Sequence, residues 1–190
     1  MREGTISPLV AGIAALIAIG LVGSLIAQGR PADLIASGTP EHTLSGINVY
    51  VTRIADARKR LGIPTRVVDY PERDRRVCES CGFRKYWWET SALRLSAAAG
   101  FHTENGRRIE SMLYAVEVWG TRPSKNGVGL TGAGLGLGDS ITSVRRFYGD
   151  RMSIARSMII VEWKDGTELT VDADQTGQIT HMQLIAGNGG

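Results

Sequence analysis

Residues 8–27 form a continuous apolar run near the N-terminus, PLVAGIAALIAIGLVGSLIA, without a charged side chain. As a helix, a run of this length extends about 30 Å, which matches the hydrocarbon core of a membrane. The pattern predicts a transmembrane helix over residues 8–28, after a tail of residues 1–7. A cleaved signal peptide is the alternative, but the run is longer than a usual signal-peptide core, which favours an uncleaved anchor.

The few charges beside this run set the predicted orientation. The α-amine and Arg2 oppose Glu3 on one side, and Arg30 opposes Asp33 on the other. The positive-inside rule then favours a cytoplasmic N-terminus. We therefore expect a single-pass protein of the bacterial cell membrane whose C-terminal domain is extracytoplasmic.

Two later segments share a helical pattern that ends at a glycine. In residues 46–62 and 134–149, hydrophobic positions recur at the i, i+3, i+7 spacing of one helix face. The residues expected to cap these helices are Thr52 and Gly62 in the first segment, and Asp139 or Ser140 with Gly149 in the second. Each segment is expected to form a short amphipathic helix.

Strand-like sequence follows each predicted helix. Asp165 and Gly166 separate two β-rich runs, and such a pair is a strong local signal for a hairpin. The expected strands are residues 85–89, 92–97 and 109–119 after the first helix, and 158–164, 167–173 and 178–185 after the second. The sequence thus predicts an α+β fold, in which the N-terminal transmembrane helix is followed by two degenerate repeats, each a helix plus a three-strand antiparallel meander.

Composition shifts between these elements predict the domain boundaries. Residues 29–45 are rich in Gly, Pro, Ser and Thr, and are expected to link membrane and domain. Repeat one is assigned to residues 46–120, with a cysteine-containing insertion at residues 67–83. A Gly-rich joint at residues 121–133 leads to repeat two, residues 134–190.

The composition limits the class of protein. The chain has 190 residues, of which 43% are hydrophobic and 22% charged, with a net charge of +3. These values exclude a large multidomain enzyme, a polytopic membrane protein and a highly charged disordered chain. The two cysteines are too few for a disulfide-rich scaffold.

The second helix and the strands after it resemble a superfamily of small bacterial envelope domains. It contains the outer-membrane assembly lipoprotein and the β-lactamase-inhibitor-protein-like repeat proteins. The matching residues are Leu137, Gly138, Ser140, Val144, Tyr148, Gly149, Trp163 and Gly166, with Ile54, Ala57, Leu61, Gly62 and Trp88 in the first repeat. The resemblance implies an extracytoplasmic, non-enzymatic module that binds another protein.

Cys78 and Cys81 form a CxxC motif, for which the sequence leaves several alternatives. Redox enzymes place the first cysteine at a helix N-terminus, and no helical pattern follows here. A zinc site needs two further ligands, and the three histidines of the chain lack ligand spacing. A small disulfide is favoured in an oxidising compartment, and free thiols are the other possibility.

Basic and aromatic residues gather around this motif. Residues 53–85 contain ten Lys or Arg against five Asp or Glu. Adjacent Trp87 and Trp88 must point to opposite faces of a strand, so one is expected in the core and the other exposed or covered by the insertion. An exposed Trp beside cations is typical of a protein interface. The predicted interaction residues are Trp87, Trp88, Arg75, Arg76, Arg84 and Lys85.

Two further motifs are interpreted as structural. Residues 127–132 (GVGLTG) match a dinucleotide-binding pattern, but no strand-helix-strand unit surrounds them, which favours a flexible connector. Asp172 and Asp174 imitate the start of a calcium loop, but Gln183 stands where that loop needs a bidentate carboxylate. A polar hairpin turn is the favoured interpretation.

These observations predict a membrane-anchored interaction or assembly subunit of a bacterial envelope complex, without enzymatic activity. The expected partners are membrane lipid, through residues 8–28, and another envelope or membrane protein. No nucleic acid, small-molecule substrate, metal or cofactor is expected. The alternative is a thiol-dependent redox or metal-handling protein that uses Cys78 and Cys81.

Overall fold

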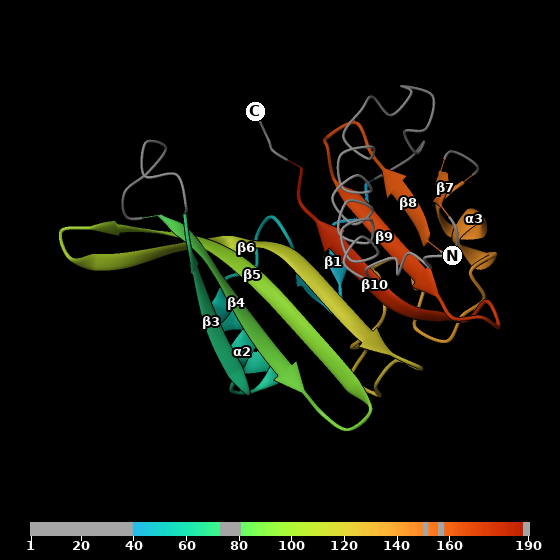
Figure 1. Cartoon of the computed structure of the whole chain (residues 1–190), viewed down its shortest axis with the longest axis horizontal. Coiled ribbons are helices and arrows are strands. Elements are labelled where there is room, and N and C mark those ends of the chain that lie inside the picture. Colours follow the sequence, from blue (N-terminus) through green and yellow to red (C-terminus); the bar gives the residue numbers. More distant parts are fainter. Residues whose placement is uncertain (1–39, 73–80, 150–151, 156–157, 188–190) are drawn as a thin grey trace, which may run out of the picture. The chain divides into compact units, whose positions relative to one another are not determined.

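One antiparallel sheet of eight strands organises the structure, a computed structural model (Figure 1). The structure describes residues 40–72, 81–149, 152–155 and 158–187, which all belong to one unit, Leu34–Gly190. The strands lie in the order β3-β4-β5-β6-β10-β9-β8-β7. They are β3 (Arg66–Pro71), β4 (Gly82–Glu89), β5 (Leu93–Glu104), β6 (Arg107–Gly120), β7 (Ser153–Ala155), β8 (Met158–Glu162), β9 (Glu168–Ala173) and β10 (Ile179–Ile185).

The remaining described elements are short. A two-stranded sheet pairs β1 (Thr43–Leu44) with β2 (Ile47–Asn48). Helix α2 spans Ile54–Leu61, and helix α3 spans Ser143–Tyr148.

The predicted ends of the two helices are confirmed, and the predicted starts are wrong. Gly62 and Gly149 end the helices with φ values of 84° and 82°, a conformation that suits glycine. The N-cap residues are Arg53 and Thr142, and neither makes a side-chain capping hydrogen bond. The hydroxyl of Thr52, the predicted cap, instead accepts a hydrogen bond from a backbone N–H before the helix.

Two hairpin turns follow local sequence rules. Strands β5 and β6 join at Asn105 and Gly106, whose φ values of 49° and 73° are both positive, as the favoured two-residue turn requires. Strands β8 and β9 join at Asp165 and Gly166, which confirms the predicted hairpin. The carboxylate of Asp165 accepts the backbone N–H of Thr167 at 3.0 Å and closes this turn.

The core lies on one face of the large sheet. Leu95, Val118 and Met182 point to this face and are at most 2% exposed. Both helices contribute to the same core, α2 through Ala57 and α3 through Val144. In Figure 1, α2 lies behind the strands, so the viewer looks at the opposite face.

We call this opposite side the helix-free face, because α2 and α3, the helices that the structure describes, both pack on the core side. Along each strand its residues alternate with the core residues, and the pairing register places them side by side. Its central members are Arg66, Lys85, Trp87, Arg94, Ser96, Ala98, Glu117, Trp119, Asp172, His181 and Gln183.

The Gly-rich residues 121–138 belong to the core side of the unit. The backbone N–H of Ser45 donates to the carbonyl of Leu130 at 2.7 Å. Leu135 is fully buried, and the carboxylate of Glu41 accepts a backbone N–H from this loop at 2.9 Å. Residues assigned from sequence to a linker and a joint are thus hydrogen-bonded to each other.

The predicted fold class is wrong. The described part is mostly β-sheet, and its helices span only eight and six residues. Strands β3 to β10 form one continuous sheet rather than two separate helix-plus-three-strand repeats, because β6 pairs with β10. The prediction also missed β3, and five of the six residues of this edge strand are exposed, so it carries no hydrophobic alternation.

The prediction of a single-pass membrane protein is corrected as well. Within the described residues, no helix combines the length and the apolar character that crossing a membrane requires. The predicted span at residues 8–28 lies outside the described residues. A long apolar run indicates that a membrane helix is energetically allowed, but by itself it does not establish one.

Candidate functional site: the helix-free face

Strand β4 places the two predicted tryptophans on opposite faces. Trp88 is 8% exposed and belongs to the core, and its indole N–H donates to the carbonyl of Gly62 at 2.9 Å. Trp87 lies on the helix-free face and is partly exposed. The prediction that only one of them is a core residue is confirmed.

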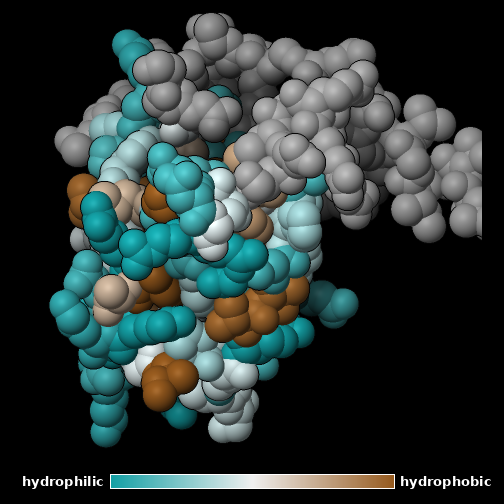
Figure 2. Space-filling view, turned by 90° about the vertical axis from the view of Figure 1, so that its left-hand side faces the viewer, coloured by the Kyte–Doolittle hydropathy of each residue, from teal (hydrophilic) through white to brown (hydrophobic). Residues whose placement is uncertain are grey.

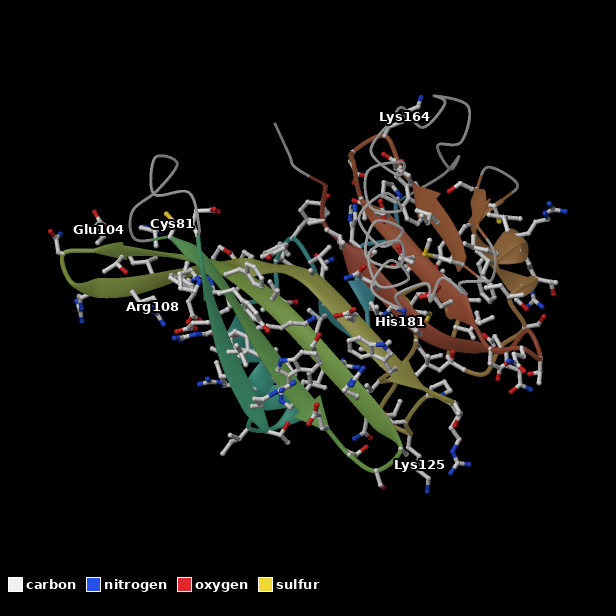
Figure 3. All side chains as sticks on the ribbon, viewed as in Figure 1. Cys81, Glu104, Arg108, Lys125, Lys164 and His181 are labelled. Atoms are coloured by element: carbon white, nitrogen blue, oxygen red, sulfur yellow. The ribbon has the colours of Figure 1, made fainter. Side chains whose placement is uncertain are left out.

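A row of three stacked rings crosses the helix-free face. Trp87 stacks on Trp119 of β6, with 5.9 Å between ring centroids and 17° between ring planes. Trp119 stacks on His181 of β10 at 4.9 Å and 16°. We call these three side chains the ring row; Figure 3 labels His181 at its β10 end. Each aromatic stack contributes about 0.5–1.5 kcal/mol beyond area burial, so the row is a preorganised surface.

Three cations lie against the ring row. The guanidinium of Arg66 is 4.6 Å from the ring centroid of Trp87, and the ammonium of Lys85 is also 4.6 Å from it. The guanidinium of Arg94 is 4.2 Å from the centroid of Trp119. These distances fall within the range of about 6 Å for cation–π attraction. The side chains of four neighbouring strands, β3 to β6, thus form one cationic and aromatic surface.

Glu117 is the central anion of this surface. Its carboxylate accepts hydrogen bonds from Lys85 at 2.6 Å and from the hydroxyl of Ser96 at 3.3 Å. Nε2 of His181 lies 3.5 Å from Glu117, and Nδ1 of His181 lies 2.6 Å from Asp172.

Burial and ion pairing shift the pKa values of Glu117 and His181 in opposite directions. Burial raises the pKa of Glu117, but its contacts with His181 and Lys85 outweigh this effect and lower the pKa to about 2. Burial lowers the pKa of His181, but Glu117 and Asp172 outweigh it and raise the pKa above the usual 6.5. Both shifts favour the charged forms, so the face is held together by ion pairs.

Two buried polar atoms in the ring row lack a hydrogen bond within the described residues, although Nε2 of His181 is ion-paired with Glu117 at 3.5 Å. The indole N–H of Trp87 and Nε2 of His181 are buried, and neither has a hydrogen-bond partner in the structure as described. A buried polar group without a partner costs about 1–3 kcal/mol. A molecule bound at the ring row would supply the missing hydrogen bonds.

One hollow borders Lys85 and Glu117 of the helix-free face, and a second lies farther along the sheet. The smaller one, about 220 Å³, includes the small side chains of Ser96 and Ala98 in its lining. The larger one, about 710 Å³, is lined by Tyr70 and Phe83, whose rings stack at 4.6 Å. Phe83 and Tyr114 line both hollows, so the concave surface continues along the sheet.

Arg84, a predicted interaction residue, belongs to a separate ion-pair network. Its guanidinium donates to both oxygens of Asp69, at 2.5 and 2.9 Å, and to Glu110 at 2.6 Å. Arg84 and then Arg108 hold the pKa of Asp69 at about 2 against the opposing effect of burial. Burial and Glu110 raise the pKa of Tyr86, which donates to Glu110, to about 12. The network ties β3, β4 and β6 together.

Figure 2 views the unit from the end that carries the tip of the β5–β6 hairpin. Its visible surface is mainly hydrophilic, and hydrophobic side chains form small separate groups. Among the exposed hydrophobic residues of the neighbouring strands are Val67 of β3 and Ile109 of β6, at 44% and 42%. Polar side chains separate the apolar ones at this end, whereas the rings on the helix-free face are contiguous.

The remaining predicted site residues fall into two groups. Arg75, Arg76 and Cys78 lie outside the described residues. Cys81 is disulfide-bonded and lines the larger hollow. Cys81 is therefore adjacent to the helix-free face rather than to the core.

The two motifs interpreted as structural have structural roles. Residues 127–132 belong to the Gly-rich loop against the core. The carboxylate of Asp174 accepts the backbone N–H groups of Thr176 and Gln178, at 2.8 and 3.1 Å, within the β9–β10 turn. Among the residues that the structure describes, no three or more His, Cys, Asp or Glu side chains are arranged to hold a metal ion.

Sequence reasoning missed most of the residues around Trp87. One signal was available: in the predicted strand at residues 109–119, Val116 and Val118 mark the core face, which places Glu117 and Trp119 on the other face. The residues that were missed are Arg66, Arg94, Glu117, Trp119, Asp172 and His181. Their proximity depends on strand pairing between distant parts of the chain.

No known protein family, characterised protein or solved structure matches this chain.

Proposed function

We propose that this protein is a non-catalytic binding module that recognises another protein through its helix-free face. The observation that carries the proposal is the ring row with its flanking cations. Tryptophan and arginine are the residue types that most often dominate the binding energy of protein interfaces. Trp87 and Trp119 are already fixed by stacking, so they lose little conformational freedom when a partner binds.

The partner is expected to present a carboxylate to this face. Lys85 is paired with Glu117, and Arg66 approaches Glu89 at 3.9 Å. Arg94 is exposed, and within the described part of the chain it forms no ion pair with a carboxylate. Its guanidinium stacks on Trp119 through the ring face, which leaves its N–H groups free to bind a carboxylate in a bidentate way.

Nucleic acid is a poorer fit to the same surface. Glu89, Glu117 and Asp172 lie among the cations and would repel phosphates. The resemblance to small bacterial envelope domains also favours a protein partner, because that resemblance implies a module that binds other proteins.

Site-directed photo-crosslinking tests the proposal. A photoreactive phenylalanine analogue replaces Arg94 on the helix-free face in one protein and Lys59 of α2 in another, and crosslinked partners are identified by mass spectrometry. Lys59 is a matched control because it is a highly exposed cation on a helix of the core side. We expect the crosslink only from position 94.

The affinities of two charge-reversal variants for the purified partner then show which face of the protein binds it. Arg94→Glu should weaken binding about tenfold or more, and Lys59→Glu, which changes the charge equally, should leave it within about twofold. Equal crosslinking from both positions, or equal loss of affinity in both variants, would show that the helix-free face is not the binding surface.

A further inference from the structure

The smaller hollow of the helix-free face is large enough to hold one apolar side chain. Its volume is about 220 Å³, and its lining includes Phe83, Ala98 and Ile185. Ala98 is only 6% exposed although it is outside the core cluster, so it lies at the bottom of the hollow. An apolar cavity of about 150 Å³ already accepts benzene, so this hollow suits a leucine or phenylalanine side chain.

Three polar side chains that line this hollow are already paired with one another. The carboxylate of Glu117 accepts hydrogen bonds from Lys85 at 2.6 Å and from Ser96 at 3.3 Å. A polar group entering the hollow would lose its hydration and compete with these bonds, whereas an apolar side chain would contact the apolar part of the lining. The hollow therefore favours an apolar side chain.

Arg94 lies at a defined distance from the hollow along strand β5. Arg94 and Ala98 are four residues apart on the helix-free face, and the pairing of β5 with β6 is regular between them. At about 3.3 Å per residue, this separation is about 13 Å. An extended peptide has the same rise, and its side chains i and i+4 point to the same side. A segment that lies along β5 can therefore reach both.

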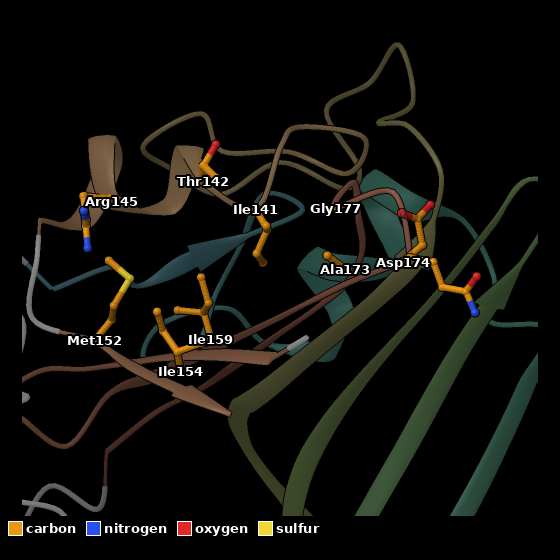
Figure 4. A pocket seen from close by; sticks show the side chains of 10 residues that line it. Ile141, Thr142, Arg145, Met152, Ile154, Ile159, Ala173, Asp174 and Gly177 are labelled. Atoms are coloured by element: carbon orange, nitrogen blue, oxygen red, sulfur yellow. The ribbon is translucent and has the colours of Figure 1, made fainter. Parts of the chain in front are cut away.

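The hollow shown in Figure 4 offers no such combination. It lies between α3 and the strands β7 to β9, on the core side of the sheet, and its volume is about 410 Å³. Ile141 and Ile159 give it an apolar wall, but Arg145 already interacts within the chain. Its described lining thus contains no cation available to a partner's carboxylate. On the helix-free face, Arg94 and an apolar hollow occur together.

We propose that the partner presents an extended segment in which an aspartate or glutamate and a leucine or phenylalanine are four residues apart. The carboxylate binds the guanidinium of Arg94, and the apolar side chain enters the smaller hollow. Trp119, on which this guanidinium stacks at 4.2 Å, excludes water from one side of the ion pair. This inference rests on the proposed function, because it specifies which kind of segment the helix-free face recognises.

Nuclear magnetic resonance titration of the full chain with synthetic peptides tests this spacing. Each blocked peptide consists of threonine and serine with one glutamate and one leucine, either four or three residues apart, in both chain directions. The composition is the same, but a spacing of three puts the two side chains on opposite faces of an extended segment. We expect the better spacing-four peptide to bind about fivefold tighter than either spacing-three peptide and to shift the methyl resonance of Ala98.

Ala98→Phe tests the hollow itself. The added ring fills the space and should reduce the preference for the spacing-four peptide to within about twofold. Ala55→Phe is the matched control and should keep the preference, because Ala55 is exposed on α2, on the core side. Thermal unfolding checks that both variants fold. The comparison of peptides on the unchanged protein remains decisive if Ala98→Phe does not fold.

Two results would overturn the inference: equal affinity for both spacings, or a folded Ala98→Phe that keeps the preference. The photo-crosslinking experiment separates this failure from failure of the proposed function. A partner crosslinked from position 94 without any preference for spacing refutes the segment and leaves the binding face in place. Absence of that crosslink refutes the binding face itself.

Discussion

Replacing Glu117 by glutamine should destabilise the sheet, because this carboxylate connects three strands through charge. His181 of the neighbouring strand β10 contacts it, and Lys85 of β4 reaches it across β5. Glutamine has nearly the same shape and can still accept the hydrogen bond of Ser96. The substitution therefore removes the charge without opening a cavity.

The pKa of Glu117 determines the size of this effect. An unperturbed glutamate has a pKa of 4.5, and that of Glu117 is about 2. At about 1.4 kcal/mol per pH unit, the difference corresponds to about 3 kcal/mol of folding free energy. The side chain of Glu117 is only 16% exposed, so solvent screens little of this contribution.

The same pKa gives the pH dependence and its sign. A carboxyl whose pKa is lower in the folded state stabilises the protein above its unfolded pKa of 4.5, and this stability is lost as the pH falls towards 2. The free energy of unfolding of Glu117→Gln should therefore be about 3 kcal/mol lower than that of the unchanged protein at pH 7. The gap should narrow steadily between pH 4.5 and pH 2.

Urea unfolding followed by tryptophan fluorescence measures this gap at pH 7, 4.5 and 2.5. Glu104→Gln is the matched control, because Glu104 lies in the exposed end of the β5–β6 hairpin and should change stability by less than about 0.5 kcal/mol. The reasoning is refuted if Glu117→Gln costs no more than the control at pH 7, or if its cost is the same at pH 2.5.

Three further predictions concern other parts of the unit. Proton NMR titration should show a pKa above 6.5 for His181. The contribution of the protonated His181 to the free energy of unfolding is present below pH 6.5 and should disappear as the pH rises through that pKa. A measured pKa below 6.5 would contradict the ion pairs with Glu117 and Asp172. Cys78→Ser combined with Cys81→Ser should lower the free energy of unfolding by less than the roughly 3 kcal/mol expected for a fifteen-residue loop, because the two cysteines are close in sequence; calorimetry of the double variant measures this loss. Trp88→Ala and Leu135→Ala should each cost about 2–5 kcal/mol in urea unfolding, and a cost below 1 kcal/mol would mean that the side chain is not in the core.

Local sequence was sufficient where one short segment determines the conformation. Asp165 and Gly166 predicted a hairpin, because Gly166 adopts a φ of 80°, which few other residues tolerate without strain. Gly62 and Gly149 predicted the helix ends for the same steric reason. The strict alternation of side chains in a strand also predicted that Trp87 and Trp88 lie on opposite faces.

Tertiary structure decided which distant residues meet. Trp119 and His181 stack only because β6 pairs with β10 in one register, and a shift by one residue would move either ring to the other face. The Gly-rich residues 121–138 looked like a connector, yet Leu135 is fully buried there, and the same loop accepts a hydrogen bond from the backbone of Ser45 through Leu130. Contacts of this kind depend on the free energy of the whole assembled sheet. They therefore cannot be predicted from any single segment of the sequence.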